Sequence, residues 1–157
     1  MTGFTHLSGD GSARMVDVSG KDVTVRTATA SGRVRVSAEV VSLLRGAGVP
    51  KGDALAVARI AGIQAAKRTP DLVPLCHPIA IHGVDVALVV ADTEVSITAT
   101  VRTADRTGVE MEALTCVSVA ALALVDMVKS VDPGAVISDI QVEEKTGGTH
   151  GTWVREP

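Results

Sequence analysis

The stretch from Gly108 to Ser130 limits the possible folds of this chain more than any other part of the sequence. It consists mainly of small and aliphatic residues, and no charged residue occurs between Ala113 and Val125. Such a segment is typical of a helix that is buried on most sides. Its apolar part is shorter than the roughly 20 residues that span a bilayer. We therefore predict a long core helix.

Acidic side chains lie at both ends of this predicted helix. Glu112 and Asp126 are 14 residues apart, which places them within about 40° of each other on one face and roughly 21 Å apart along the axis. Carboxylates at that distance cannot form a close acid–base pair within one subunit. They serve different sites, opposite ends of one extended site, or sites that another chain completes. A symmetric oligomer provides the last arrangement easily, so we predict a homo-oligomer with composite pockets.

Composition limits the partners and the location of the protein. The net charge of −3 offers no strong positive field to nucleic acid or anionic lipid. Phe4 and Trp153 are the only aromatic residues, so the body of the chain has no platform on which bases could stack. Cys76 and Cys116 form no CxxC pair, and no secretory signal is evident. We expect a cytoplasmic protein that binds neither nucleic acid nor membrane.

Local patterns predict one α+β domain. Residues 1–13 are polar and rich in Gly and Ser, as in a flexible arm, and residues 14–157 form the single domain. Ser37 and Asp53 are typical helix N-caps, and alternating apolar residues indicate strands. The predicted helices cover residues 38–45, 54–68 and 108–130, and the predicted strands cover residues 15–18, 24–30, 33–36, 81–90, 94–102 and 136–142. Ser31-Gly32 is expected to turn a hairpin, and Pro70 to end the second helix. This order favours an antiparallel sheet with helices on one face.

Few sequence features indicate chemistry. The histidines at positions 6, 77, 82 and 150 lack metal-ligand spacing, and no phosphate-binding loop occurs, so we expect neither a metal nor a cofactor. His77, between two prolines, is either a positioned acid, base or phosphate donor, or a capping or structural histidine. Asp126 and Lys129 form either an exposed ion pair worth about 0.2–0.5 kcal/mol or, if desolvated, a proton-transfer pair. Lys67 ends a helix, where a cation complements the dipole, and Cys116 is expected to be inert core.

Several motifs together resemble one family. They are THLSGDGSARMVDVSGKDVTVRTATA, KGDALAVARIAGIQAAKRTPDLVPLCHPI, TGVEMEALTCVSVAALALVDMVK and KTGG. The chain closely resembles the molybdenum cofactor biosynthesis protein C family, the cyclic pyranopterin monophosphate synthases, over nearly its whole length. This chain has Cys116 at a position where a small residue is expected for the family.

The resemblance implies an activity, an assembly and a site. Family members convert 3′,8-cyclo-7,8-dihydro-GTP into cyclic pyranopterin monophosphate and release diphosphate. They have a ferredoxin-like α+β fold and form hexamers, built as trimers of dimers with sites between subunits. The matching positions imply Asp126 as the catalytic acid or base with Lys129 as its partner, and they add Lys51 and His77. The implied substrate contacts are Leu75, Cys76, His77, Glu110, Met111, Glu112 and Lys145.

The charge of the implied substrate makes further residues candidates. A site without a phosphate-binding loop must neutralise a triphosphate with side chains, and the available cations are Lys51, Lys67, Lys129, Lys145 and Arg26. A competing hypothesis is a non-catalytic pterin- or nucleotide-binding or assembly module on the same scaffold. Such a module would keep the cations but would not need the Asp126–Lys129 couple or His77.

Overall fold

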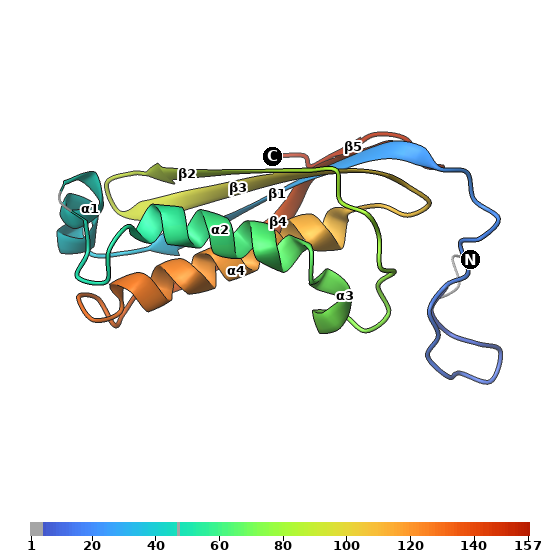
Figure 1. Ribbon diagram of the computed structural model, residues 1–157, viewed down its shortest axis with the longest axis horizontal. Helices are drawn as coiled ribbons and strands as arrows, with labels where there is room; N and C mark the ends of the chain where they lie inside the picture. Colours follow the sequence, from blue (N-terminus) through green and yellow to red (C-terminus); the bar gives the residue numbers. More distant parts are fainter. Residues whose placement is uncertain (1–4, 47) are drawn as a thin grey trace.

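An antiparallel sheet with helices on one face forms the framework of the protein (Figure 1). The computed structural model describes residues 5–46 and 48–157. The strands are β1 (Thr24–Arg35), β2 (Gly83–Val90), β3 (Glu94–Asp105), β4 (Val136–Thr146) and β5 (Trp153–Val154), in the order β2-β3-β1-β4-β5. The helices are α1 (Ala38–Arg45), α2 (Ala54–Ala66), α3 (Thr69–Leu72) and α4 (Glu110–Val128). This is the βαββαβ arrangement of a ferredoxin-like fold, so the predicted fold class is confirmed.

The predicted hairpin at Ser31-Gly32 is wrong. Residues 24–35 form one strand that pairs continuously with β3, from Thr24 opposite Asp105 to Arg35 opposite Glu94. A Cβ atom on Gly32 would lie 2.8 Å from Cγ1 of Val117 and 3.1 Å from Cγ1 of Ile140. The pairing with β4 also shifts register between Ser31 and Arg33. Gly32 therefore allows a helix and a strand to approach closely, which is the other common role of a strand glycine.

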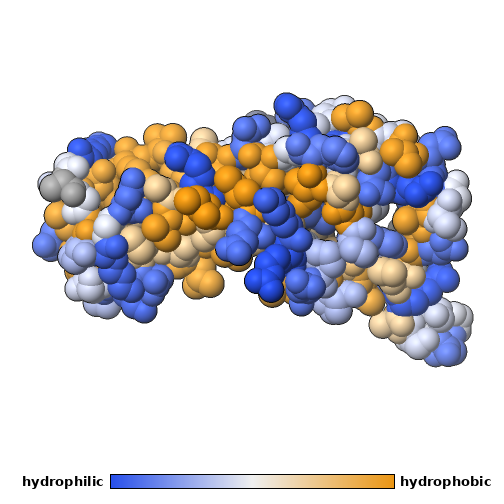
Figure 2. All heavy atoms as spheres, viewed as in Figure 1, coloured by the Kyte–Doolittle hydropathy of each residue, from blue (hydrophilic) through white to orange (hydrophobic). Residues whose placement is uncertain are grey.

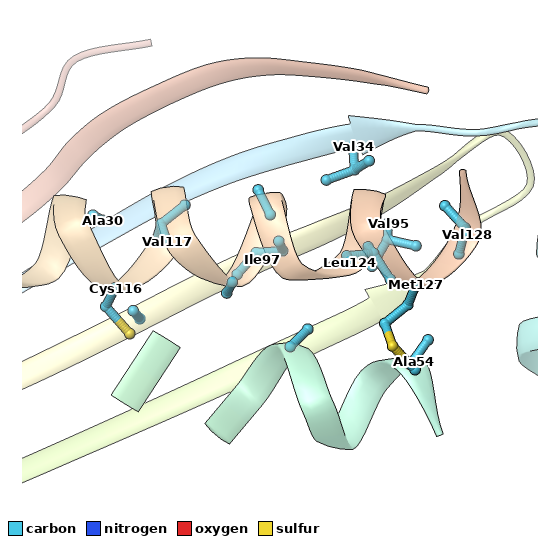
Figure 3. Packing of buried hydrophobic residues seen from close by; sticks show 14 of the residues in the cluster. Ala30, Val34, Ala54, Val95, Ile97, Cys116, Val117, Leu124, Met127 and Val128 are labelled. Atoms are coloured by element: carbon cyan, nitrogen blue, oxygen red, sulfur yellow. The ribbon is translucent and has the colours of Figure 1, made fainter. Parts of the chain in front are cut away.

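Small residues bring the two long helices together. A Cβ atom on Gly62 of α2 would lie 2.9 Å from the carbonyl oxygen of Cys116 and 3.2 Å from its Sγ. Cys116 is fully buried, and burial raises the pKa of its thiol to about 12. The expectation of an inert core cysteine agrees with this position. Two other buried residues of α4, Val117 and Leu124, face the sheet (Figure 3).

Helix α4 is the predicted core helix. By length and composition alone it is apolar enough to cross a membrane. Much of it is buried against the sheet and α2, however, and a core helix of a domain passes the same test (Figure 1). Its buried residues include Glu112 at one end and Met127 and Val128 at the other.

The capping residues were predicted correctly, whereas some short elements were not. The side chain of Ser37 accepts a hydrogen bond from Val40 N–H at 3.3 Å, and that of Asp53 accepts one from Ala56 N–H at 3.0 Å. Helix α2 ends before Pro70, which lies in the first turn of α3 instead of terminating α2. Strand β5 was not predicted, because two exposed residues give no alternating pattern.

The N-terminal segment differs from its prediction in part. The strand expected over residues 15–18 does not form. Residues Leu7 and Ala13 form an isolated antiparallel bridge that closes a turn. The first four residues of the expected arm lie outside the described residues, and its flexibility stays a prediction.

Candidate active site

A cavity of about 380 Å³ lies at the N-terminal end of α4. This volume is within the range of small-molecule sites. Two predicted segments meet in it, one before β2 and one opening α4, although they are far apart in the sequence. They contribute the predicted substrate contacts Leu75, Cys76, His77, Glu110, Met111 and Glu112. The N-terminal segment supplies a further wall through Thr5, His6, Val16 and Val18.

His77 connects the loop before β2 to the N-terminal segment. Its Nε2–H donates a hydrogen bond to the carbonyl oxygen of Val16. The imidazole is half-buried and lines the cavity. This bond supports the structural role considered for His77, and the cavity position supports the functional role. The two roles are compatible, because a bond that fixes one ring nitrogen also orients the other.

Glu112 is the buried carboxyl of the cavity. It is only 3% exposed, and among the described residues no cation lies within 4 Å of it. Burial raises its pKa to about 7, and the neighbouring charge of Glu110 contributes in the same direction. Burial, together with the charge of Glu112, also raises the pKa of Cys76. A carboxyl with a pKa near neutrality can take up or release a proton at physiological pH.

A second cavity, of about 200 Å³, adjoins the first. Lys21, Arg26, Lys145 and His150 line it, and Glu110 lines both cavities. Glu110 forms an ion pair with Lys145, with 3.1 Å between Oε1 and Nζ. The cations outnumber the single acid, so this cavity favours an anionic ligand.

Arg26 is built into the wall of the second cavity. It is 8% exposed, and its Nε–H donates a hydrogen bond to the carbonyl oxygen of Asp105 at 3.1 Å. A Cβ atom on Gly148 would lie 2.2 Å from an Arg26 Nη atom, and one on Gly147 would lie 2.2 Å from the Val25 carbonyl oxygen. Of the two glycines of the KTGG motif, Gly147 therefore allows a close approach to the backbone of β1, and Gly148 allows a close approach to the Arg26 guanidinium.

The predicted pair of Asp126 and Lys129 lies at the other end of α4 and includes a third residue. Asp126 Oδ1 is 2.8 Å from Lys129 Nζ and 3.2 Å from Lys51 Nζ. Hydrogen bonds from Lys129 and then Lys51, followed by their charges, lower the pKa of Asp126. The Asp126 side chain is 56% exposed, so in the single chain this cluster is a solvated ion pair network.

Lys67 belongs neither to the cavities at the N-terminal end of α4 nor to the Asp126 cluster. It is the exposed C-terminal cap of α2 and is not among the residues that line the two cavities. Its position fits the dipole role that a cation has at a helix end.

Sequence reasoning missed several residues that line the cavities. Lys21, His6, Thr107 and His150 were not candidates, and Arg26 was considered only as an available cation. Lys21, His6 and Thr107 lie within the quoted motifs, which was a usable signal. His150 lies outside them and lines the same cavity as His6 only because the two ends of the chain fold together, which no sequence spacing indicates.

Fold and cavities together define a ferredoxin-like α+β protein with a cavity of small-molecule size beside a second cavity lined mainly by cations. The chain belongs to the MoaC family, whose model matches residues 15–148.

Named relatives agree with this assignment. The chain is 72% identical to a cyclic pyranopterin monophosphate synthase of Streptomyces coelicolor over 97% of this chain and 89% of that protein. It is 70% identical to the protein of that name from Nocardioides sp., over 97% of this chain and 95% of the relative. It is 61% identical to cyclic pyranopterin monophosphate synthase 2 of Mycobacterium tuberculosis, over 97% of this chain and 91% of that protein.

Proposed function

We propose that this chain is a cyclic pyranopterin monophosphate synthase, a lyase of molybdenum cofactor biosynthesis. It converts 3′,8-cyclo-7,8-dihydro-GTP into cyclic pyranopterin monophosphate and releases diphosphate. The observation that carries the proposal is the meeting of Leu75, Cys76 and His77 with Met111 and Glu112 in one cavity beside a cationic one. Close identity to the named synthases supports the same activity.

The two cavities match the two parts of this substrate. The cavity around Glu112 offers a carboxyl that can exchange a proton near neutral pH, as rearrangement of a pterin ring requires. Lys21, Arg26 and Lys145 in the adjoining cavity face the phosphates. Closing the cyclic phosphate expels diphosphate, and fixed cations stabilise the charge that develops on the leaving oxygens.

The cluster of Asp126, Lys129 and Lys51 enters the site from a second subunit in this proposal. Helix rise separates Glu112 from Asp126 by roughly 21 Å, which is too far for both to touch one reacting atom. An isologous interface brings the Asp126 end of one α4 to the Glu112 end of another. There Asp126 acts as the acid or base and Lys129 as its partner, with Lys51 and His77 completing the catalytic group.

An exposed apolar face supports such an assembly. Figure 2 shows apolar residues spread over the side on which α2 and α4 are visible. The exposed apolar side chains of these two helices are Val57 and Ile60 of α2, at 43% and 65% exposure, and Met111 and Leu122 of α4, at 39% and 61%. Extended apolar surface of this kind marks interfaces between proteins. We propose a homo-oligomer, a hexamer built as a trimer of dimers, that works in the cytoplasm without a resident cofactor.

The test is to incubate the purified protein with the cyclised GTP substrate and to measure diphosphate and cyclic pyranopterin monophosphate. Stoichiometric formation of both products is expected. Tight binding of substrate without turnover would instead favour the non-catalytic pterin- or nucleotide-binding module. The apparent mass of the protein in solution, measured in parallel, tests the hexamer.

A further inference from the structure

The turn between β4 and β5 holds a histidine at its tip. After Thr146, Gly147 and Gly148 adopt left-handed backbone angles, with φ of 83° and 79°. The N–H of Gly151 then donates a hydrogen bond to the carbonyl oxygen of Gly148 at 3.3 Å. Thr149 and His150 are the two central residues of this turn.

Strand pairing on both sides fixes the position of this turn. Trp153 lies opposite Lys145, and Val154 lies opposite Glu144. Arg155 extends the pairing, because its N–H donates to the carbonyl oxygen of Glu143 at 2.8 Å. The tip is therefore held by a short hairpin instead of hanging from a free terminus.

His150 lies at the boundary between the two cavities. It lines the cavity of Glu112 and also the cationic cavity, and it shares this position with Lys21, Thr107, Gly108 and Glu110. Its side chain is exposed and makes no hydrogen bond to the part of the chain that the structure describes. The fold does not use this imidazole, so its donors are free for a ligand.

The charges around His150 favour an anion on one side only. The charged groups that line the same two cavities are Lys21, Arg26, Lys145, Glu110 and Glu112. Glu110 is paired with Lys145, which leaves Lys21 and Arg26 as cations without an acidic partner among the described residues. Glu112 faces the other cavity and carries a proton below about pH 7.

We propose that His150 is a further substrate-binding residue, which contacts a phosphate oxygen where the two cavities meet. This proposal rests on the proposed function. An imidazole donates a hydrogen bond in either protonation state and adds a positive charge when protonated, which happens between about pH 5 and 8. A positively charged side chain at position 150 therefore joins Lys21 and Arg26 on the phosphate chain and binds the polyphosphate more tightly than a neutral one.

Diphosphate is the probe that tests this role, because it is the proposed leaving group and requires no turnover. Its affinity for the full-length protein is measured by calorimetry at about pH 5.5 and about pH 8, which bracket the titration of an imidazole. The variants are His150→Gln, which stays neutral, and His150→Lys, which stays charged. His82→Gln is the matched control, because His82 is an exposed histidine outside both cavities and its Nδ1 accepts a hydrogen bond from Ala104 N–H.

The other ionisable groups that line the cavity of Glu112 include His6, Cys76 and His77, and the pKa of Glu112 itself is about 7. The charge of diphosphate also changes with pH. Each variant is therefore compared with the parent protein at the same pH, so that these contributions cancel.

The expected result is a roughly three- to five-fold weaker affinity for diphosphate in His150→Gln at the lower pH, the size of one partly exposed ion pair. The difference from the parent shrinks at the higher pH, and His150→Lys binds more tightly than the parent there. Equal affinity of His150→Gln and the parent at the lower pH would overturn the proposal, as would a parent that does not bind diphosphate. The turnover assay of the parent protein decides the proposed function separately, because it does not depend on these variants.

Discussion

The two ends of α4 present the same functional group in opposite environments. At the N-terminal end, Glu112 is buried beneath the loop of Leu75 to His77, and its pKa rises to about 7. At the C-terminal end, Asp126 lies in solvent between two lysines, and its pKa is lowered. Carboxylates whose pKa values are moved apart can take different roles in one reaction. The comparison shows that the pKa values of these two acids differ because of what surrounds each end of the helix, and not because of the helix itself.

The largest expected effect concerns the exposed end. Asp126→Asn or Lys129→Ala should lower turnover by roughly 10²-fold or more, as expected for lost general acid–base catalysis. Folding should be unchanged, because both side chains are exposed. Steady-state product formation and the thermal melting temperature are the measurements. Arg68 and Asp71 form an exposed ion pair of the same i, i+3 spacing, so Asp71→Asn is the control and should keep full turnover. Near-normal turnover of Asp126→Asn would show that the cluster is an ordinary surface ion pair without a catalytic role.

The second prediction concerns the buried end. The folded-state pKa of Glu112, about 7, lies above the ordinary value of 4.5, so between these values the folded protein binds more protons than the unfolded chain. Stability should therefore fall as the pH rises through this window. Glu112→Gln removes the buried charge and should raise the free energy of unfolding by up to about 3 kcal/mol at pH 8 relative to the parent, since one pKa unit corresponds to about 1.4 kcal/mol.

Urea unfolding at about pH 5 and about pH 8 measures this difference. Glu39→Gln is the control, because Glu39 is also a first-turn glutamate but is exposed, and its effect should be small at both values. A Glu112→Gln protein whose stability depends on pH as the parent's does would show that the carboxyl is ionised in the folded state throughout.

A third prediction tests whether the two ends meet between subunits. Inactive Glu112→Gln and Lys129→Ala proteins are unfolded, mixed in equal amounts and refolded together. Random pairing gives about one native pocket in four, so the mixture should regain about a quarter of the parent activity. Mixing Asp126→Asn with Lys129→Ala is the control, since both changes lie on the same side of the proposed interface. If subunit exchange is shown by mass and the first mixture stays inactive, the composite site is excluded.

The smallest effect is expected for substrate affinity at Lys51. Lys51→Ala removes one cation that contacts Asp126, and we expect the affinity for substrate to fall by about five-fold, as for one partly exposed ion pair. Added salt should weaken binding in the parent by screening the same charges. Arg45→Ala is the control, because Arg45 forms an exposed ion pair with Asp92 away from both cavities. An unchanged affinity in Lys51→Ala would separate Lys51 from the substrate.

Local signals explain what the sequence could predict about the fold. Ser37 and Asp53 cap helices through bonds to residues three positions away, and β2 and β3 show their alternation in neighbouring residues. Gly32 was misinterpreted because its reason for being glycine lies in Val117 and Ile140, far along the chain. A turn and a close contact are indistinguishable from the residue alone.

The candidate site could also be predicted only in part, where local signals or the family resemblance indicated its residues. The resemblance supplied the segments around His77 and Glu112, and helix geometry correctly placed Glu112 and Asp126 at opposite ends. The contrast in burial between them could not be predicted, because it depends on which loop covers each helix end. His150 was missed since a two-residue strand anchors its turn, and such a strand leaves no pattern.

The close contacts of Gly32 and Gly62 have a consequence for the redesign of this chain. Gly32 allows Val117 to approach β1, and Gly62 allows α2 to approach Cys116. These two contacts, at adjacent residues on different sides of α4, fix the position and the rotation of the helix relative to the sheet and to α2. Inserting one residue between Val117 and Asp126 would turn the far end by about 100° and advance it by about 1.5 Å, which directs the Asp126 carboxylate, together with Lys129, away from Lys51. The number of residues between the two helix ends is therefore as important for the proposed site as the identity of Asp126 itself.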